Sequence, residues 1–401
     1  MGNIRLENVF KIFGPHPERA FPLLDKGLGK QEILEKTGLG VGVNDASFEV
    51  EEGEIVVVMG LSGSGKSTLV RCINRLIEPT RGRVLIDGRD VTALPTDELR
   101  KLRLEKLGMV FQNFALFPHR SVADNAAYGL EIKGVDAATR RAKAHEALAK
   151  VGLAGWEDSA PGQLSGGMQQ RVGLARALAL DPEILLMDEA FSALDPLIRR
   201  DMQDELLALQ DDMRKTIVFI SHDLDEALKL GDRIVLMKDG RIVQIGTPED
   251  IMTSPANEYV ERFVAEVDIT KVLTAESVMR KPAAVAYQDH DGPRSALRKM
   301  RSENISSLFV LDSAHHIAGI VTAEECSRLI ESGSRDLTTT MRTDVITVTP
   351  ETPAQELIQI LHDLPYPLGV VNARGRLAGV IVRGALLGAM AERGRATDVS
   401  A

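Results

Sequence analysis

Residues 54–67 of this chain read EIVVVMGLSGSGKS. The run Glu54–Met59 is apolar and rich in β-branched residues, which favours a buried strand of a mostly parallel sheet. Helical spacing begins at Lys66 and predicts a helix to about Leu76. The glycines between them match G-x-x-x-x-G-K-[ST], a loop whose backbone N–H groups curl around phosphate at a helix N-terminus. This stretch predicts an α/β fold with a phosphate-binding loop.

The loop predicts how a nucleoside triphosphate is held. Lys66 reaches the β- and γ-phosphates, and the hydroxyl of Ser67 coordinates Mg²⁺. A glycine-rich turn arising by chance would not place both residues correctly between a strand and a helix. The expected ATP-binding residues of this loop are Gly60, Leu61, Ser62, Gly63, Ser64, Gly65, Lys66, Ser67 and Thr68.

A second apolar strand, Ile184–Met187, ends in the carboxylates Asp188 and Glu189. Such a strand delivers Asp188 to the edge of the sheet beside the metal, and Glu189 is placed to polarise an attacking water. An isolated acidic pair after a strand is more often a helix cap. Together with the phosphate loop it predicts nucleoside triphosphate hydrolysis, without selecting a family.

The motif that selects the family is LSGGMQQ at Leu164–Gln170. Ser165 and two glycines open a helix, which is again an anion site. Because the chain already has a phosphate loop, a second anion site suggests the γ-phosphate of a partner's ATP; the alternative is a capped helix without a ligand. At this motif the sequence resembles the ABC ATPase family, whose signature is LSGG-x-Q.

The resemblance implies a head-to-tail homodimer, with each ATP between one protomer's Lys66 loop and the other's Ser165 helix. Three more segments follow the family order: the Q-loop at Phe111-Gln112, the D-loop at Ser192–Asp195 and the switch at Ser221–Asp223. The ATP-binding residues implied outside the phosphate loop are Phe13, Gln112, Ser165, Gly166, Gly167, Gln169 and Asp195.

The resemblance also implies individual roles. Glu189 is the general base, and His222 holds the γ-phosphate, a role that rests on the resemblance because a lone histidine at a strand end is usually structural. Phe13 stacks on adenine. The Mg²⁺ ligands are Ser67, Gln112 and Asp188, and Gln112 also senses the membrane partner.

Bulk properties fit a cytosolic protein of more than one domain. The chain has 401 residues, 44% of them hydrophobic and 26% charged, which exceeds what one core usually sustains. The net charge of -10 argues against a nucleic acid partner, and the basic stretch Arg71–Arg83 is interpreted as a solvated face. The N-terminus lacks a signal-peptide core. Cys72 and Cys326 fall in different predicted domains, so no structural disulfide is expected.

The chain divides into three predicted regions. Residues 1–268 form the ATP-binding domain, with an inserted segment at about 15–43 that holds a short helix near Lys30–Lys36. Two similar segments follow, at 275–332 and 337–392, each with the order strand, helix, strand, strand, helix. They resemble the tandem CBS module. The implied fold is therefore a P-loop domain with a RecA-like core, an antiparallel β subdomain and a helical signature subdomain, followed by an α+β CBS pair.

The CBS pair leaves its role open. Such modules often bind adenine nucleotides through a Thr or Ser followed by Asp; here Thr322 is followed by Glu325, and the second repeat has Val382 and Ala385. An anionic membrane surface is an alternative ligand, suggested by the basic residues Arg280, Lys281, Arg294, Arg298, Lys299 and Arg301. A dimerising structural module is the third possibility.

The insertion containing His16–Phe21 and Ile33–Gly38 and the run Met187–Arg199 resemble the ATP-binding subunits of glycine betaine/proline importers. This implies a permease pair, an extracytoplasmic substrate-binding protein and a peripheral position on the cytoplasmic face of the membrane. The apolar segment Gln112–His119 is expected to receive the permease or to pack internally. Importers of choline or carnitine and, less favoured, a non-transport ABC ATPase are the alternatives.

Overall fold

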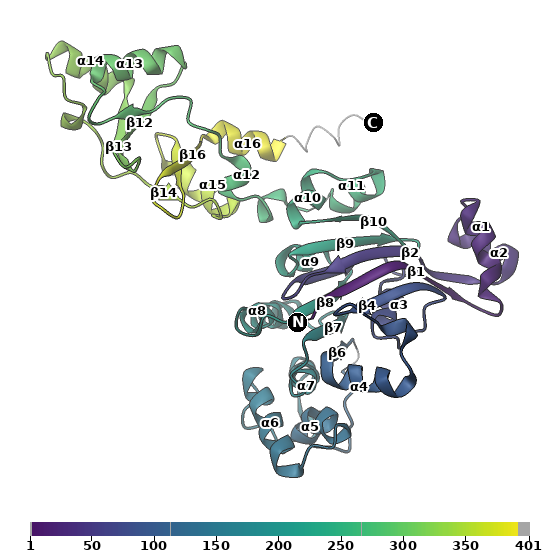
Figure 1. Cartoon of the computed structure of the whole chain (residues 1–401). Helices are drawn as coiled ribbons and strands as arrows, with labels where there is room; N and C mark the ends of the chain where they lie inside the picture. The colour runs from purple at the N-terminus through teal and green to yellow at the C-terminus, as the bar shows by residue number, and fades with distance from the viewer. Residues whose placement is uncertain (1, 113, 266, 392–401) are drawn as a thin grey trace. The chain divides into compact units, whose positions relative to one another are not determined.

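The computed structural model describes residues 2–112, 114–265 and 267–391. The chain divides into two compact units, residues 1–267 and 268–401 (Figure 1). Both cysteines are buried and unpaired. Across the described ranges, no helix combines the length and apolar character needed to span a bilayer.

A six-stranded sheet of order β10-β9-β3-β8-β7-β6 forms the centre of the first unit. All neighbouring strands are parallel except the edge pair β9 and β10. Every residue of β3, β7 and β8 is buried, as the continuous apolar runs predicted. The bounds are β3 Ile55–Met59, β6 Leu107–Phe111, β7 Ile184–Asp188, β8 Thr216–Ser221, β9 Arg233–Lys238 and β10 Arg241–Gly246.

Because these strands are parallel, their carboxyl ends meet at one edge, where ligands of open α/β sheets bind. The phosphate loop follows β3, Gln112 follows β6, Asp188 ends β7 and His222 follows β8. The helices of this layer are α3 Lys66–Ile73, α4 Thr96–Lys106, α8 Pro196–Met213, α9 Leu224–Leu230, α10 Pro248–Thr253 and α11 Glu258–Val264. Helix α3 ends three residues before the predicted Leu76, because Arg75 adopts a left-handed conformation (φ 56°).

An antiparallel sheet of order β2-β1-β4-β5 forms a second layer, as predicted. Its strands are β1 Ile4–Phe13, β2 Gly40–Val50, β4 Arg81–Ile86 and β5 Arg89–Asp90, followed by the 3₁₀ turn η2 Val91–Ala93. Apolar side chains of both sheets and of α3 form one core cluster. The strand β2 is tied to the first sheet by the hydrogen bond from the Asn44 backbone N–H to the Gly240 carbonyl, at 2.7 Å.

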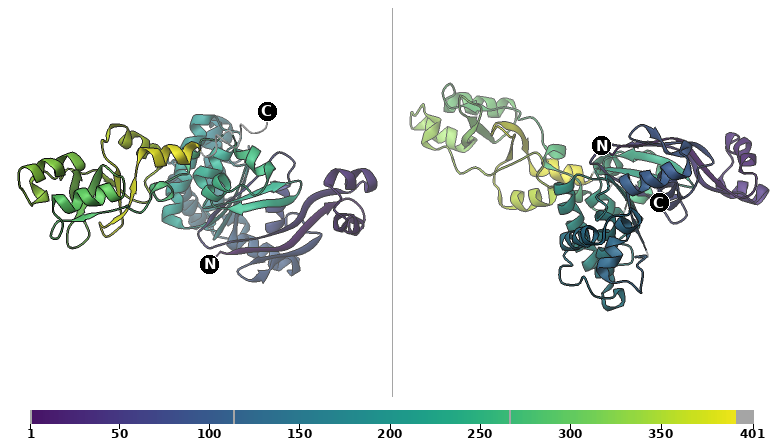
Figure 2. Two further views of the ribbon diagram at one scale, coloured as in Figure 1. Left: turned by 90° about the horizontal axis from the view of Figure 1, so that it is seen from above. Right: turned by 60° about the horizontal axis from the view of Figure 1, so that its bottom comes forward.

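The inserted segment lies between β1 and β2 and consists of η1 Pro17–Ala20, α1 Phe21–Asp25 and α2 Lys30–Thr37. Figures 1 and 2 show it as a small lobe at the end of these strands. It has its own core, in which Leu24 and Ile33 pack with Ile12 and Val41 of the strands. The predicted limit of about 43 was too long, since residues 40–43 belong to β2.

A helical subdomain lies between β6 and β7 and contains α5 Val122–Ile132, α6 Ala137–Lys150, the turn η3 Pro161–Gln163 and α7 Gly166–Leu178 (Figure 2). Ser121, Asp136 and Ser165 cap the three helices by accepting a backbone N–H bond, which defines each start. The subdomain therefore presents the LSGG segment at the beginning of α7.

The second unit contains two three-stranded sheets, β11-β12-β13 and β14-β15-β16. Each repeat follows the predicted order of strand, helix, strand, strand and helix. The bounds are η4 Ile269–Lys271, α12 Ala275–Val278, β11 Ala286–Tyr287, α13 Pro293–Ser302, β12 Ser307–Leu311, β13 Ile317–Thr322, α14 Ala323–Glu331, η5 Leu337–Thr339, β14 Thr347–Val348, α15 Ala354–Asp363, β15 Leu368–Val371, β16 Leu377–Ile381 and α16 Arg383–Ala391.

The two repeats exchange equivalent contacts. The backbone of Arg280 in the first repeat forms an antiparallel β-bridge with Val380 of the second. Arg342 of the second repeat forms the equivalent β-bridge with Ile320 of the first. A Cβ at Gly319 would lie 2.6 Å from the Arg342 carbonyl oxygen, whereas one at Gly379 would lie 2.6 Å from the Met279 sulfur. The pair is therefore pseudo-symmetric. The Met341 side chain, at 2.5 Å, and the Arg342 backbone both close the first contact, whereas the flexible Met279 side chain closes the second.

This difference predicts unequal effects of alanine. Gly319→Ala is expected to destabilise the second unit by about 1–3 kcal/mol through overpacking, and Gly379→Ala by less, because the Met279 thioether can move. Hydrogen exchange of peptides from β12–β13 and β15–β16 in the full chain would measure both. Gly384→Ala is the control, since a Cβ there meets nothing within 4 Å. Equal protection in all three variants would contradict the prediction.

Candidate active site

A groove of about 380 Å³ opens over the phosphate loop. It brings together the predicted residues Phe13, Lys66, Ser67 and Glu189. Phe13 ends β1 and is 43% exposed, so its ring is open to a ligand in the groove. The full lining is Phe13, Lys30, Gly40, Val41, Gly42, Ser62, Gly63, Gly65, Lys66, Ser67, Thr68 and Glu189.

Two glycines of the loop are required by close backbone approach. Gly60 has φ 142°, and a Cβ there would lie 2.2 Å from the Met237 carbonyl oxygen. Gly65 has φ 104°, and a Cβ would lie 2.2 Å from the Gly42 carbonyl oxygen. Both positions need the left-handed backbone that only glycine adopts freely. The loop is thereby held between β2 and β9.

The Lys66 side chain is buried within this loop. Its Nζ donates to the carbonyl oxygens of Gly60 at 2.8 Å and Leu61 at 3.2 Å. Burial lowers the pKa of the Lys66 ammonium, and the carboxylates of Glu189 and Asp188 oppose that shift. The loop therefore holds a cation that carbonyl oxygens only partly neutralise. A phosphate oxygen would complete its charge balance.

Asp188 is almost fully buried at the end of β7. Arg71 of α3 donates to its Oδ2 from Nη2 at 3.0 Å and from Nε at 3.2 Å. Arg71 is nevertheless 44% exposed, in agreement with the interpretation of residues 71–83 as a solvated face. The interpretation was wrong for Arg75, whose side chain is 18% exposed and whose Nη1 donates to the Val91 and Leu94 carbonyls. Arg75 lies just after the end of α3, where its left-handed backbone (φ 56°) directs the chain away from the helix.

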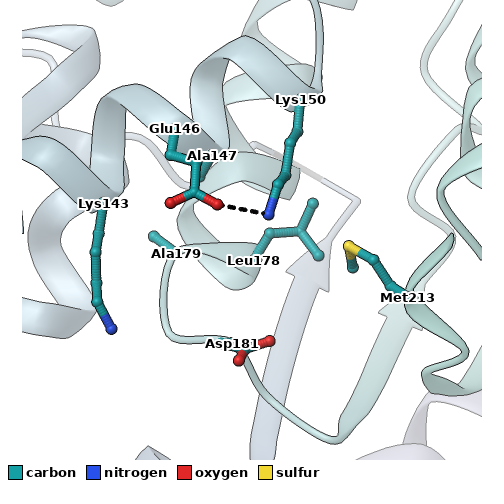
Figure 3. A pocket seen from close by; sticks show the side chains of 8 residues that line it. All are labelled: Lys143, Glu146, Ala147, Lys150, Leu178, Ala179, Asp181 and Met213. Carbon is teal, nitrogen blue, oxygen red and sulfur yellow. Dashed lines mark ion pairs between the residues drawn. The ribbon is translucent and has the colours of Figure 1, made fainter.

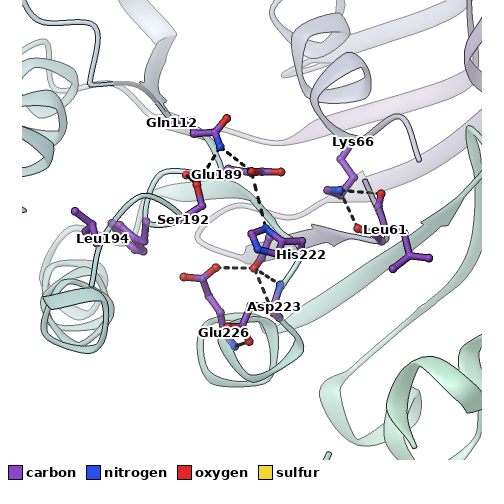
Figure 4. A network of polar contacts seen from close by, with 12 residues as sticks. Leu61, Lys66, Gln112, Glu189, Ser192, Leu194, His222, Asp223 and Glu226 are labelled. Atoms are coloured by element: carbon purple, nitrogen blue, oxygen red, sulfur yellow. Dashed lines mark hydrogen bonds and ion pairs between the residues drawn. The ribbon is translucent and has the colours of Figure 1, made fainter. Parts of the chain in front are cut away.

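Gln112, Glu189 and His222 converge at the carboxyl edge of the sheet (Figure 4). The Gln112 Nε2 donates to Glu189 Oε2 at 3.1 Å and to Ser192 Oγ at 3.2 Å. The His222 Nδ1 lies 3.9 Å from the same Glu189 oxygen. Glu189 itself has φ 49°, an uncommon conformation for a non-glycine residue that is found at functional sites.

Buried polar contacts hold the switch segment in place. Ser221 Oγ donates to Glu226 Oε2 at 2.5 Å, and Gln203 Nε2 donates to Glu226 Oε1 at 3.0 Å. Burial raises the pKa of the Glu226 carboxyl, against the effect of these hydrogen bonds. Side chains of α8 and α9 thus hold the loop that carries His222.

The D-loop is held by a residue that sequence reasoning missed. Arg199 of α8 donates to the carbonyl oxygens of Phe191 at 3.2 Å, Ser192 at 3.1 Å and Leu194 at 3.3 Å. One arginine therefore defines the path of the chain between Glu189 and α8. Its place at the end of the quoted run Met187–Arg199 was the available signal.

The signature residues lie apart from the groove. Ser165 and Gly166 are exposed, and Ser165 Oγ accepts from the Met168 N–H at 3.3 Å. The Gln169 amide donates to the Pro161 and Leu164 carbonyls at 3.1 and 3.2 Å, so its donors hold the loop before α7. Gly167 is required by Ile198, which a Cβ would meet at 2.6 Å. None of Ser165, Gly166, Gly167, Gln169 and Asp195 lines the described groove.

Comparisons with known proteins agree with this geometry. The model of the family described as ABC transporter matches residues 43–192, and that described as CBS domain matches 275–332 and 335–392. The chain is 55% identical over 388 residues to the glycine betaine transport ATP-binding protein OpuAA of Bacillus subtilis (strain 168), covering 97% of this chain and 92% of the relative. It is 49% identical over 393 residues to the glycine betaine/proline betaine transport system ATP-binding protein ProV of Salmonella typhimurium, covering 98% of each.

This chain belongs to the ABC transporter ATP-binding proteins. Among solved structures, the dimeric ABC transporter cassette MJ0796 matches with a TM-score of 0.53 and 34% identity, over 61% of this chain and 98% of that one. A second structure of MJ0796 holds ADP and Pi in a post-hydrolysis state. The family therefore supports ATP hydrolysis by this cassette.

A smaller hollow of about 160 Å³ in this ABC cassette lies between α6 and the ends of α7 and α8 (Figure 3). Its charged groups are largely engaged: Lys150 pairs with Glu146 at 2.8 Å, and Asp181 pairs with Lys215 at 2.7 Å. It contains none of the predicted site residues.

Two side chains of the first CBS repeat are engaged in capping α14. Glu325 Oε2 accepts from the Thr322 backbone N–H at 2.8 Å and from its hydroxyl at 2.9 Å.

Lys299, predicted to be an exposed cation, instead donates to Asp291 Oδ2 at 2.7 Å and is half-buried. These contacts leave less polar capacity for a nucleotide or a membrane surface than the sequence indicated.

Proposed function

We propose that this chain is the ATP-hydrolysing subunit that energises import of glycine betaine or proline betaine from the cytoplasmic face of the membrane. The observation that carries the proposal is similarity over nearly the whole chain, CBS pair included, to relatives named for this transport. A non-transport ABC ATPase is disfavoured because the CBS pair and the insertion are both covered by that similarity. The implied partners are a second copy of the chain, a permease pair and an extracytoplasmic binding protein.

The groove supports ATP binding from base to phosphate. Phe13 stacks on adenine at one end, since aromatic faces are stable platforms for bases. The loop N–H groups between Gly60 and Thr68 receive the phosphates, and Lys66 leaves its carbonyl partners for the β- and γ-oxygens. His222, exposed beside Glu189, holds the γ-phosphate.

Hydrolysis is assigned to Glu189. Its carboxylate accepts a proton from the attacking water as the water oxygen bonds to the γ-phosphorus and the bond to the leaving ADP oxygen breaks. Gln112, hydrogen-bonded to Glu189, orients that water. Because Gln112 begins the segment toward His119, it also relays the state of the permease.

The donor chemistry fits Mg²⁺. Ser67 offers a hydroxyl, Gln112 an amide oxygen and Asp188 a carboxylate, and Mg²⁺ prefers such oxygen ligands completed by water and phosphate. In the described part of the chain, no cluster of three or more His, Cys, Asp or Glu side chains could hold a metal ion. Bound Mg²⁺ would offset the charge of the β- and γ-phosphates.

Exposed apolar side chains support the head-to-tail dimer. Leu61 in the phosphate loop is 59% exposed, and Leu197 and Ile198 at the start of α8 are 70% and 37% exposed. Exposed apolar surface beside a site marks an interaction surface. A partner's Ser165 helix seated on the phosphate loop would cover Leu61 and complete the γ-phosphate site.

Carnitine is the second candidate cargo. The glycine betaine/carnitine transport ATP-binding protein GbuA of Listeria monocytogenes is 53% identical over 97% of this chain, so the identities alone separate the two poorly.

Uptake into proteoliposomes tests the cargo. Vesicles enclosing ATP and this chain, with its permease pair inserted and the binding protein outside, are expected to accumulate labelled glycine betaine. Vesicles with the Lys66→Ala chain are the control and should accumulate none. Uptake of carnitine or choline without glycine betaine uptake would replace the cargo, and no ATP-dependent uptake of any of them would contradict the transport function.

A further inference from the structure

A lysine of the inserted segment reaches the nucleotide groove. Lys30, the first residue of α2, donates from Nζ to the Gly63 carbonyl oxygen of the phosphate loop at 2.8 Å. It also lines the groove together with Lys66, Ser67 and Glu189. The insertion is therefore in direct contact with the loop that binds phosphate.

The insertion holds this lysine in a defined place. Ile33, one turn after Lys30, is fully buried and packs in the cluster with Ile12, Leu39 and Val41. These residues belong to or adjoin β1 and β2, whose Phe13 and Gly40–Gly42 form another part of the groove wall. The backbone of α2 is thus anchored to the same strands that bound the nucleotide site.

The charge of Lys30 is not neutralised by a carboxylate. In the described ranges it forms no ion pair, and its Nζ donates to the neutral Gly63 carbonyl. A lysine ammonium has three donors on a flexible stem, so one carbonyl leaves donors for a second acceptor. A cation half-buried at the wall of a groove that receives a triphosphate is placed to bind phosphate oxygens.

We propose that Lys30 is a second nucleotide-binding lysine, supplied by the insertion, that contacts the phosphate chain of ATP over Gly63. This inference rests on the proposed ATP-binding function of the groove. The contact to Gly63 holds the side chain over the loop in the absence of nucleotide, and phosphate oxygens replace or share that contact. Because the interaction is with phosphate charge, it strengthens from ADP to ATP.

Affinity measurements on the full chain test this role. Lys30→Gln is expected to weaken binding of a non-hydrolysable ATP analogue about two- to fivefold at low salt, the range of a partly exposed charge pair. The loss for ADP is expected to be smaller, and both losses should shrink at about 1 M salt, where the Debye length is about 3 Å. Lys30→Arg keeps the charge and should bind nearly as wild type.

Lys36→Gln is the matched control, because Lys36 is exposed in the last turn of the same helix and does not line the groove. If Lys30→Gln lowered the affinities for ATP and ADP equally and independently of salt concentration, Lys30 would only stabilise the loop. That result would overturn the proposal. Unchanged affinity would overturn it too. Lys66→Ala measured in parallel separates the two claims: if it loses ATP binding while Lys30→Gln does not, only the role of Lys30 fails.

Discussion

Glu189→Gln is expected to lower ATP turnover by about 10²–10⁴-fold, the contribution of a positioned general base, while ATP still binds. The amide is isosteric and keeps an oxygen that can accept from Gln112, whose Nε2 lies 3.1 Å from Glu189 Oε2. What it loses is the capacity to take the water proton. The variant should therefore accumulate as a closed, ATP-bound dimer.

Single-turnover hydrolysis and size-exclusion chromatography with Mg·ATP would measure both effects. Asp211→Asn, at an exposed position late in α8, is the control and should turn over normally as an ATP-dependent dimer. Normal turnover by Glu189→Gln would remove Glu189 from the role of base. A dead variant that also fails to bind ATP would indicate lost structure rather than lost chemistry.

Lys66→Ala is expected to reduce ATP affinity by at least about 10²-fold, the cost of removing one preorganised charged donor from a water-poor site. The Lys66 side chain is 5% exposed, so its charge acts with little screening. Alanine also frees the Gly60 and Leu61 carbonyls that the ammonium now occupies, and these oxygens would face the phosphates unneutralised.

Calorimetric titration with ATP in the absence of turnover measures this loss. Lys36→Ala, in the same charge class but outside the groove, should bind as wild type. Retention of micromolar-range affinity by Lys66→Ala would mean that the backbone N–H groups of the loop suffice. Melting of the protein without nucleotide should change little, because the substitution removes a charge that burial already disfavours.

The sequence predicted those helices and strands whose ends are marked by neighbouring residues, such as a capping side chain or a glycine. Helix α6 begins at Ala137, because Asp136 supplies a cap that accepts from the Thr139 N–H at 3.0 Å. Strands β3 and β7 and the loop after β3 were equally readable, since buried apolar runs and glycine spacing are properties of contiguous residues. The pairing of repeats in the second unit was visible as repeated sequence.

Contacts between distant segments were not predictable in this way. Arg71 reaches Asp188 over 117 positions, and Lys30 reaches Gly63 over 33. Nothing in the flanking residues distinguishes these cations from solvated ones, because their partners are brought near only by the parallel sheet and by the anchored insertion. Arg199 likewise has the sequence context of an ordinary helix residue, and its contacts with the D-loop carbonyl oxygens form only in the folded chain.

Mixed dimers test most directly whether ATP is held between two chains. Each heterodimer would be assembled from two full-length chains with different tags and purified through both tags. Both chains carry Glu189→Gln, and the number of ATP molecules retained per dimer is measured. One heterodimer pairs Lys66→Ala with Ser165→Arg; the other pairs an otherwise unaltered chain with one that carries both substitutions.

In a head-to-tail dimer the first combination retains one intact site, because an unaltered Lys66 and an unaltered Ser165 lie in opposite chains, and the second combination retains none. The account therefore predicts one trapped ATP in the first heterodimer and none in the second. The reverse result, ATP trapped only where both substitutions share one chain, would show that each site is built within a single chain and would contradict it.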